Sequence, residues 1–458
     1  MLRHCGEDGL SLAAMLKRMR HSLLFAQSSG LRLGSAVVAL TLVSLAPAGQ
    51  RHRKHRTEAL VAPKEKKSEE PKALMPNPEA LNAKTAVIID ADTGRVLWSK
   101  DALKPMYPAS TTKVMTGLLL IEHCTPNEVI TAPKDIKNVG EASMHLQPSE
   151  RVSMRNLLWA IMLRSANDGC YAAAMHVGGS IPSFAKMMND RAAQLGCKNT
   201  HFANANGLHD KNHWTCAYDL ALMGREAMKN PLFAETVRTF KYKIARELNQ
   251  KDLWMVNHNK LLKNDPTTDG IKTGYTVPAG HTFVGSATRN GQRIITALMK
   301  SDHWQLDQEA MLNWAYANFD HKTIAHKGDA AGEVAIDGGT APSVKAVLQA
   351  DVLDCVQKGT ASGLKGSFQP AKLELPVKEG QVVGNMMYTD STGFTLRVPA
   401  IAATSVDRAT PLARVTGRSP SFYIVGSSLG LGLIWYRSRS RRSRYYGKST
   451  PKSKLTPF

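Results

Sequence analysis

The alternation of apolar and polar positions predicts that ordered structure begins near residue 85. Ala86–Asp90 is a short apolar run typical of a strand, and Arg95–Trp98 is a second one. An Asp-Thr-Gly turn separates them, so a β-hairpin is expected. A second hairpin is predicted for His281–Thr288 and Gln292–Met299, because an Asn-Gly pair, a strong turn signal, stands between them.

Helical periodicity dominates the stretch between these hairpins. Val114, Leu118 and Ile121 recur at helical spacing, so a helix is expected to open near Ser110. One more helix is expected outside this stretch, after the second hairpin, near Glu309–Phe319. Between the hairpins, residues 150–230 carry four further helical patterns: Leu157–Trp159, Ala172–His176, Phe184–Leu195 and Ala217–Met228.

The pattern changes near residue 330 to short β-like runs. These runs are Val344–Val352, Lys372–Leu375, Gln381–Val383 and Gly393–Val398. They predict a small all-β domain over residues 330–415, which follows a mixed domain of strands and helices over residues 85–325.

Residues 1–84 precede the predicted domains. Leu33–Gly49 is apolar and uncharged, follows a basic region and contains an Ala-Pro-Ala site, which is typical of a secretory signal peptide. Residues 1–49 are therefore expected to be a signal peptide or an uncleaved N-terminal anchor. Residues 50–84 are rich in Lys, Glu, Pro and Ala without an apolar period, so a disordered linker is expected there.

An uncharged segment, Ser419–Tyr436, follows the predicted β domain. As a helix it would be about 27 Å long at 1.5 Å per residue, which just matches a hydrocarbon core of roughly 30 Å. The positive-inside rule places the basic tail over residues 437–458 in the cytoplasm and the body outside. A transmembrane helix over residues 419–436 is expected, and a surface-lying amphipathic helix or a solvated tail is the alternative.

The net charge also separates these ends from the body. The 458 residues carry a formal charge of +21, which would ordinarily suggest nucleic acid or an anionic membrane as a partner. Residues 1–84 account for +7 and residues 418–458 for +9, so residues 85–417 carry only +5. No nucleic-acid partner is therefore expected. None of the six cysteines has metal-ligand spacing, and small buried side chains with at most one disulfide are expected.

Ser110 and Lys113 form the first of three motifs that could carry chemistry. In this S-x-x-K pattern both residues share one face of a helix. Lys113 could then take the proton of the Ser110 hydroxyl, which is a weak nucleophile without such a base, if burial or another cation lowers the pKa of the lysine. Pro108-Ala109 would start the helix and place Ser110 near the positive end of its dipole. Alone the motif is weak, because solvated helix faces often contain it.

The other two motifs are Ser165-Ala166-Asn167 and Lys272-Thr273-Gly274. Ser165 could relay a proton toward a leaving amine and Asn167 could hold a substrate amide, although a plain helix N-cap explains the same residues. On a strand, the lysine supplies positive charge, the threonine a hydroxyl donor, and the glycine lets a substrate approach the backbone. A charged edge strand would contain the same residues.

In this order, 55 and then 107 residues apart, the motifs are similar to the set of penicillin-binding proteins and class A β-lactamases. The chain resembles the low-molecular-mass penicillin-binding proteins, serine D-Ala-D-Ala carboxypeptidases, over residues 85–415. The resemblance implies an α+β fold: a mainly antiparallel sheet flanked by helices plus a helical subdomain, followed by a small all-β domain. Further matching segments are Tyr107–Lys113, Asn199–Phe202 with Asn206–His209, and Asp269–Gly274.

The resemblance also implies a reaction. The enzyme would be an acyl-enzyme hydrolase of the inner (cytoplasmic) membrane, anchored through its C-terminal helix, with the catalytic domain on the periplasmic side. Ser110 would attack the carbonyl between the two terminal D-alanines of a peptidoglycan stem peptide, with Lys113 as its base. Ser165 and Lys272 would pass a proton to the departing D-Ala. Penicillins and other β-lactam antibiotics would acylate Ser110 by the same route, and no metal or organic cofactor is implied.

The same resemblance assigns the substrate-binding residues. Thr273 and Lys272 would hold the free carboxylate of the terminal D-Ala, and Asn167 and Gly274 would complete the binding surface. Backbone N–H groups of Ser110 and Tyr275 would form the oxyanion hole.

The sequence departs from the family pattern at two places. Tyr275 stands where the family often has His, which matters little if only its N–H is used. Many members carry an Arg shortly before the helix after the last strand, but His303–Glu309 contains none. A D,D-endopeptidase or a β-lactamase on the same fold, or a catalytically inert wall-binding scaffold, therefore stay as alternatives. A β-lactamase is disfavoured because no convincing E-x-x-L-N segment lies between the second and third motifs.

Overall fold

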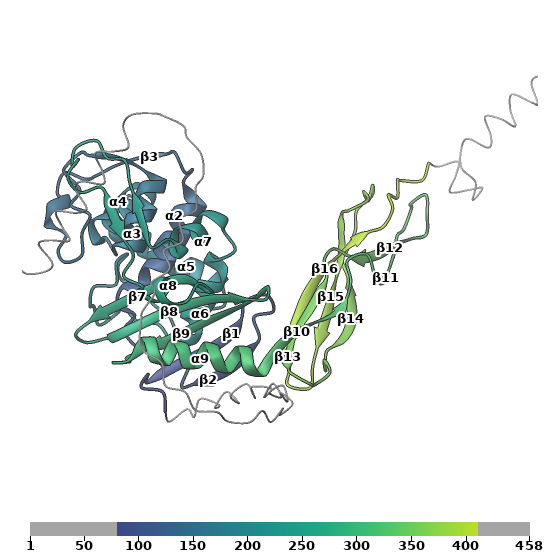
Figure 1. Cartoon of the computed structure of the whole chain (residues 1–458). Coiled ribbons are helices and arrows are strands. Elements are labelled where there is room, and N and C mark those ends of the chain that lie inside the picture. Colours follow the sequence, from purple (N-terminus) through teal and green to yellow (C-terminus); the bar gives the residue numbers. More distant parts are fainter. Residues whose placement is uncertain (1–79, 411–458) are drawn as a thin grey trace, which may run out of the picture. The chain divides into compact units, whose positions relative to one another are not determined.

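The computed structural model describes residues 80–410. The predicted leader, linker, transmembrane segment and basic tail lie outside this range. A five-stranded antiparallel sheet in the order β2-β1-β9-β8-β7 organises the first domain (Figure 1). Its strands are β1 (Thr85–Asp90), β2 (Val96–Lys100), β7 (Thr268–Thr276), β8 (Gly280–Arg289) and β9 (Gln292–Met299).

The alternation of side chains along β1 gives this sheet two buried faces. Ala86 and Ile88 belong to a core that includes α9 (Trp304–Asn318). Val87 and Ile89 point into a larger core shared with the helical part of the domain on the opposite face (Figure 1). The helices of that part are α2 (Lys113–His123), α3 (Met154–Leu163), α4 (Asn167–Gly178), α5 (Ile181–Gln194), α6 (Ala217–Ala227) and α7 (Pro231–Arg238). The short helix α8 (Leu261–Asn264) lies apart from these, with Leu261 packed against the core that includes α9.

Both predicted hairpins are present in the sheet. Asn290 and Gly291 have φ of +51° and +82°, as a tight two-residue turn between β8 and β9 requires. Arg289 pairs with Gln292 across this turn, and the ladder continues to Thr282 opposite Met299. The sequence did not predict several short elements, because three-residue strands and single turns carry little periodicity. Among them are η2 (Ile136–Asn138), β3 (Val129–Thr131), β4 (Arg151–Ser153), β5 (Lys241–Lys243), β6 (Trp254–Val256), α7 and α8.

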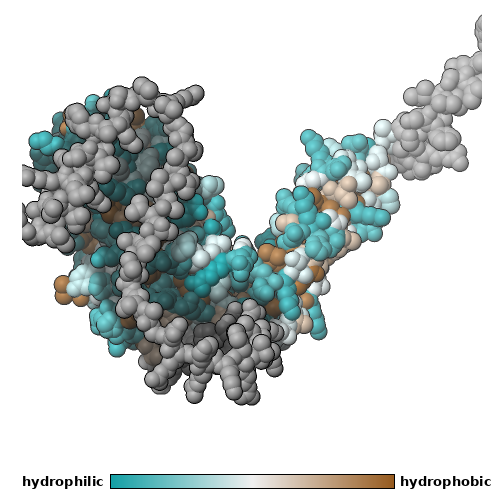
Figure 2. Space-filling view, viewed as in Figure 1, coloured by the Kyte–Doolittle hydropathy of each residue, from teal (hydrophilic) through white to brown (hydrophobic). Residues whose placement is uncertain are grey.

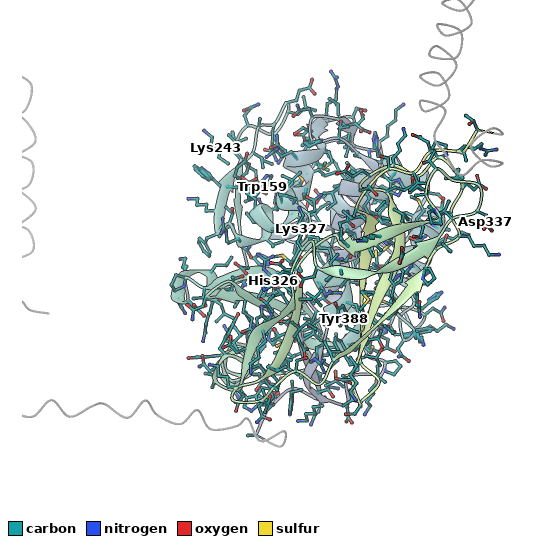
Figure 3. The ribbon with its side chains drawn as sticks, turned by 90° about the vertical axis from the view of Figure 1, so that its right-hand side faces the viewer. Trp159, Lys243, His326, Lys327, Asp337 and Tyr388 are labelled. Atoms are coloured by element: carbon teal, nitrogen blue, oxygen red, sulfur yellow. The ribbon has the colours of Figure 1, made fainter. Side chains whose placement is uncertain are left out.

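An all-β domain follows α9. Its strands are β10 (Phe319–Ala325), β11 (Ala330–Ala335), β12 (Ser343–Leu348), β13 (Val352–Gln357), β14 (Lys365–Pro370), β15 (Val382–Thr389) and β16 (Thr395–Ala402). β10 pairs with β13, and the other five form a sheet in the order β11-β12-β16-β15-β14. His326 and Lys327 lie before β11, whereas Asp337 follows its other end (Figure 3). The α+β fold class with a terminal β domain is confirmed.

One sequence prediction about local structure is wrong, because Lys372–Leu375 is not a strand. Residues 370–375 instead line a cavity of about 880 Å³ in the β domain. The helix expected to open near Ser110 is present: it starts as a 3-10 turn, η1 (Ala109–Thr112), and continues as α2 from Lys113. The φ of Ala109 is +50°, which an α-helix does not accommodate.

The cysteines and the surface of the described residues are those of an ordinary globular protein. All five cysteines in this range are free and buried. The face of the molecule in Figure 2 is mostly hydrophilic, with small separate apolar patches. Among residues 80–410, no helix has the length and apolar character to cross a membrane.

Candidate active site

The Lys113 ammonium lies at the centre of the predicted site. Its Nζ is 2.9 Å from the Oγ of Ser110, 2.8 Å from the Oδ1 of Asn167 and 2.6 Å from the backbone oxygen of Asn206. The side chain is fully buried. Burial disfavours the charged form and lowers the pKa of Lys113 below 10.5, which favours a neutral amine that can accept a proton.

The second motif contributes a hydroxyl that has no partner. Ser165 links α3 to α4 with φ of +64°, a strained value for a residue other than glycine. Its Oγ is buried and makes no hydrogen bond. Such a group is costly to leave unpaired, so it is suited to a substrate or a water. Asn167 is the first residue of α4, and its Nδ2 donates to the oxygen of Gly140 at 3.0 Å. The alternative of a Ser165 N-cap does not hold, since the N-cap is Ala166 without a side-chain hydrogen bond.

The third motif lies on β7, an edge strand of the sheet. Burial, together with the charge of Lys113, lowers the pKa of Lys272 to about 7. Its Nζ donates to the oxygen of Thr273 at 2.9 Å. A side chain at Gly274 would come within 2.9 Å of the backbone nitrogen of Ser110. The glycine therefore lets β7 lie directly against the turn that carries the serine.

These motifs meet at one cavity of about 520 Å³. Six of the predicted residues line it: Ser110, Ser165, Asn167, Thr273, Gly274 and Tyr275. Lys113 and Lys272 do not line it but lie buried behind that surface. The sequence analysis did not predict the remaining lining residues, which come from loops, the start of β8 and the start of α9, where no motif marks them. They are Glu141, Ala142, His258, Lys260, His281, Asp302, Trp304 and Gln305.

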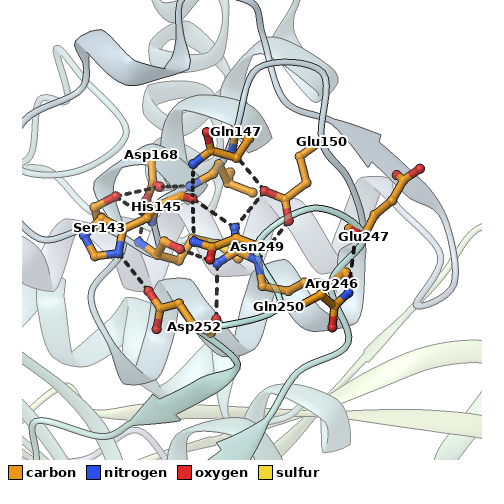
Figure 4. Close-up of polar contacts among 12 residues, drawn as sticks. Ser143, His145, Gln147, Glu150, Asp168, Arg246, Glu247, Asn249, Gln250 and Asp252 are labelled. Atoms are coloured by element: carbon orange, nitrogen blue, oxygen red, sulfur yellow. Dashed lines mark hydrogen bonds and ion pairs between the residues drawn. The ribbon is translucent and has the colours of Figure 1, made fainter.

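A buried polar network holds the loop that carries Glu141 and Ala142. The carboxylate of Asp168, next to Asn167 on α4, accepts from the hydroxyl of Ser143 at 2.7 Å and from the N–H of Met144 at 3.0 Å (Figure 4). The same carboxylate accepts from the N–H of Leu146 at 2.9 Å. One acidic residue therefore ties this loop to the start of α4.

An ion pair anchors the far end of the same loop. Arg246 donates to both carboxylate oxygens of Glu150, at 2.9 and 2.7 Å, and both side chains are fully buried (Figure 4). Arg246 also donates to the backbone oxygens of Met144 and His145. The loop over residues 143–150 is thus fixed to the segment around Arg246.

A tight turn supports the serine from the other side. Asn206 supplies the carbonyl that Lys113 contacts, and Gly207 next to it has φ of +85°. A Cβ on Gly207 would overlap the backbone carbonyl of Ala109. The Oδ1 of Asn204 accepts from the N–H of Gly207 at 2.8 Å and holds this turn.

The fold is that of the penicillin-binding proteins, and the site places the Ser110 hydroxyl 2.9 Å from the Lys113 amine, as a serine hydrolase of this architecture would. The chain belongs to the D-alanyl-D-alanine carboxypeptidase family: the family model matches residues 71–303. The model for the C-terminal domain of penicillin-binding protein 5 matches residues 319–408. The resemblance inferred from the motifs is confirmed, and so is the assignment as a serine peptidase.

Curated relatives and solved structures agree with this membership. D-alanyl-D-alanine carboxypeptidase DacF of Bacillus subtilis is 28% identical over 342 residues, which cover 72% of this chain and 87% of the relative. DacB2 of Mycobacterium tuberculosis is 32% identical over 258 residues, 54% of this chain and 87% of the relative. The structure of penicillin-binding protein 5 from Haemophilus influenzae matches with a TM-score of 0.58 and 26% identity, covering 72% of this chain and 98% of that one.

Proposed function

We propose that this chain is a D,D-carboxypeptidase that removes the terminal D-Ala from peptidoglycan stem peptides through an acyl-enzyme on Ser110. The observation that carries the proposal is the 2.9 Å contact between the Nζ of Lys113 and the Oγ of Ser110 at the cavity. The neutral amine takes the hydroxyl proton while Oγ bonds to the carbonyl carbon between the two D-alanines. The N–H groups of Ser110 and Tyr275 stabilise the oxyanion that forms.

The collapse of the tetrahedral intermediate breaks the C–N bond. Ser165, whose buried Oγ has no partner, and Lys272 pass a proton to the departing amine of D-Ala. Water then attacks the ester carbonyl, which releases the shortened peptide and returns the proton to Ser110. Asn167 and Gly274 position the peptide backbone of the substrate.

The free carboxylate of the terminal D-Ala is the feature that selects a carboxypeptidase substrate. We assign its binding to the hydroxyl of Thr273 and the charge of Lys272. In place of the Arg expected shortly before α9, the cavity there presents Asp302, Trp304 and Gln305. Affinity for the carboxylate therefore depends mainly on Thr273 and Lys272 of β7, since no arginine at that place adds a second positive charge.

Two measurements test the proposed reaction. Fluorescent penicillin should label the wild-type chain and should not label Ser110→Ala, because the ester needs the Ser110 oxygen. The wild type should also release D-alanine from a pentapeptide stem, and Ser110→Ala should release none. Labelling of Ser110→Ala would overturn the assignment of the nucleophile. Rapid penicillin hydrolysis without D-alanine release would favour a β-lactamase, and a wild type that is neither labelled nor active would favour an inert wall-binding protein.

We also propose that the enzyme works on the outer side of the cytoplasmic membrane. Substrates of this chemistry lie in the cell wall, and the charge pattern of residues 1–49 and 419–458 is that of an export signal, a membrane span and a cytoplasmic tail. In this proposal residues 50–84 form a linker, residues 85–325 the catalytic domain and residues 330–415 the β domain. Protease added to spheroplasts should digest the catalytic domain and spare an epitope placed after Arg437. Digestion of that epitope without detergent would contradict this topology.

A further inference from the structure

Three side chains with metal-binding atoms meet away from the active site. Cys124 lies just after α2, Glu128 lies in the loop before β3, and His176 is in the last turn of α4. Their sulfur, carboxylate oxygen and ring nitrogen all lie within 4.8 Å of one another. The proposed reaction uses none of the three.

The separations suit a small tetrahedral ion. Zinc binds thiolate sulfur at about 2.3 Å and imidazole nitrogen or carboxylate oxygen at about 2.0–2.2 Å, so its donors lie roughly 3.4–3.7 Å apart. The Oε1 of Glu128 and the Nε2 of His176 are 2.8 Å apart and share a proton. An ion that replaces this proton needs the two side chains to separate by less than about 1 Å. The Oε2 of Glu128 stays with the N–H of Thr125, which it accepts at 3.0 Å.

The helices themselves favour a cation at this place. α2 and α4 pack against each other, and the cluster lies at the C-terminal end of each helix, since Cys124 caps α2 and His176 is in the last turn of α4. The C-terminal end of a helix carries partial negative charge on its unpaired carbonyls. Cys124 is 9% exposed, whereas the side chains of Glu128 and His176 are 34% and 29% exposed. An ion can therefore enter from solvent and keep a water as its fourth ligand.

We propose that Cys124, Glu128 and His176 form a binding site for a thiophilic divalent cation, of which Zn²⁺ is the example. The donor set of one sulfur, one nitrogen and one oxygen selects zinc, cobalt or cadmium over magnesium and calcium, which require oxygen ligands. Binding releases the thiol proton and the proton shared by the other two side chains. The ion would join the C-terminal ends of α2 and α4, whose opposite ends carry Lys113 and Asn167.

A second cluster provides a matched control. Asp90, His321 and Cys355 also bring three donor atoms within 4.8 Å. Both carboxylate oxygens of Asp90 are hydrogen-bonded, one to the N–H and hydroxyl of Thr93 and the other to His321 at 2.6 Å, much as those of Glu128 are bonded to His176 and Thr125. The Sγ of Cys355 also accepts a hydrogen bond, from the Nε2 of Gln292 at 3.3 Å. What separates this cluster from the first is solvent access, because the side chain of Asp90 is fully buried and that of His321 is 16% exposed. Cys355→Ser should therefore leave metal binding unchanged.

Cobalt titration of the untagged, chelator-treated full-length chain tests the proposal. Co²⁺ bound to a thiolate gives an intense near-ultraviolet charge-transfer band, and Zn²⁺ should abolish this band by displacement. Wild type and Cys355→Ser should show the band at one equivalent. Cys124→Ser should lack it, and His176→Ala should need more than about 100-fold more Co²⁺, because even second-shell changes cost 10–100-fold. Zn²⁺ should raise the melting temperature of wild type and of Cys355→Ser alone.

Each outcome decides between the two clusters or against both. The absence of a band in the wild type overturns the proposal. A band that survives in Cys124→Ser but disappears in Cys355→Ser moves the site to the other cluster and also overturns it. His176→Ala alters a part-exposed side chain and should fold even if Cys124→Ser does not. Labelling of each variant by fluorescent penicillin, at the wild-type rate, shows that the active site is intact while metal binding is lost.

Discussion

Replacing Arg246 with methionine should destabilise the catalytic domain strongly, because it breaks a fully buried ion pair. The guanidinium donates to both oxygens of the Glu150 carboxylate and to the backbone oxygens of Met144 and His145. Neither charged side chain has any solvent exposure. Water therefore cannot replace the arginine without a rearrangement of the loop over residues 143–150.

The expected cost follows from what the substitution leaves behind. A buried carboxylate that loses its partner typically costs about 3–5 kcal/mol of folding free energy. Burial opposes ionisation of Glu150, but the hydrogen bond and charge of Arg246 hold its pKa below 4.5. In the wild type, the stability that the ion pair of Glu150 and Arg246 contributes is present above pH 4.5 and is lost as the pH falls through the folded-state pKa of Glu150. Arg246→Met should raise the pKa of Glu150, so its stability deficit should shrink in acid.

Urea denaturation of the full-length chain measures this cost as a free energy of unfolding. Arg155→Met is the matched control, because Arg155 pairs with Glu235 at 3.9 Å on the surface, where about 1 kcal/mol or less is expected. The double variant with Glu150→Gln removes the stranded charge and should recover part of the loss, by roughly 0.5–3 kcal/mol. The reasoning is refuted if Arg246→Met costs no more than Arg155→Met, or if the two single losses simply add.

Three further predictions concern the active site and the Asp90–His321 pair. Gly274→Ala should slow penicillin acylation by about 100-fold, because its Cβ would come within 2.9 Å of the Ser110 nitrogen and displace the nucleophile; an unchanged rate in stopped-flow labelling would contradict this. The acylation rate should rise with pH as Lys113 loses its proton at a pKa that burial lowers below 10.5, and a flat pH profile would argue against this base. Burial opposes protonation of His321, but the hydrogen bond and charge of Asp90 raise its pKa above 6.5. The stability that the Asp90–His321 pair contributes is therefore complete below pH 6.5 and disappears as the pH rises through the folded-state pKa of His321. In His321→Gln that alkaline loss should vanish from the unfolding free energy, and an unchanged slope would show that another group is responsible.

Much of the fold could be predicted from the sequence where periodicity is long or turn chemistry is distinctive. The β8–β9 hairpin was predictable because Asn290 and Gly291 both need positive φ. The helices with continuous apolar stripes were predictable because apolar residues recur at helical spacing over several turns. The 3-10 turn at Ser110 was not, because it depends on contacts made elsewhere: Gly207 and Gly274 both press against this turn from distant parts of the chain.

The candidate site divides in the same way. Ser110, Ser165 and Thr273 belong to short motifs, so their residue types and order predicted a common cavity. Residues such as His258 and Asp302 reach the cavity from loops, and nothing in their local sequence marks them.

The position of β1 in the sheet has a consequence for how the chain folds. β1 lies between β2 and β9, so its six buried residues, 85–90, depend on a partner more than 200 positions later in the chain. Pairing over such a distance makes folding slow compared with local helix formation. Before residues 292–299 are synthesised, an emerging chain leaves one edge of β1 unpaired and apt to associate with other strands. Truncations that end before β9 should therefore aggregate rather than yield a smaller active enzyme.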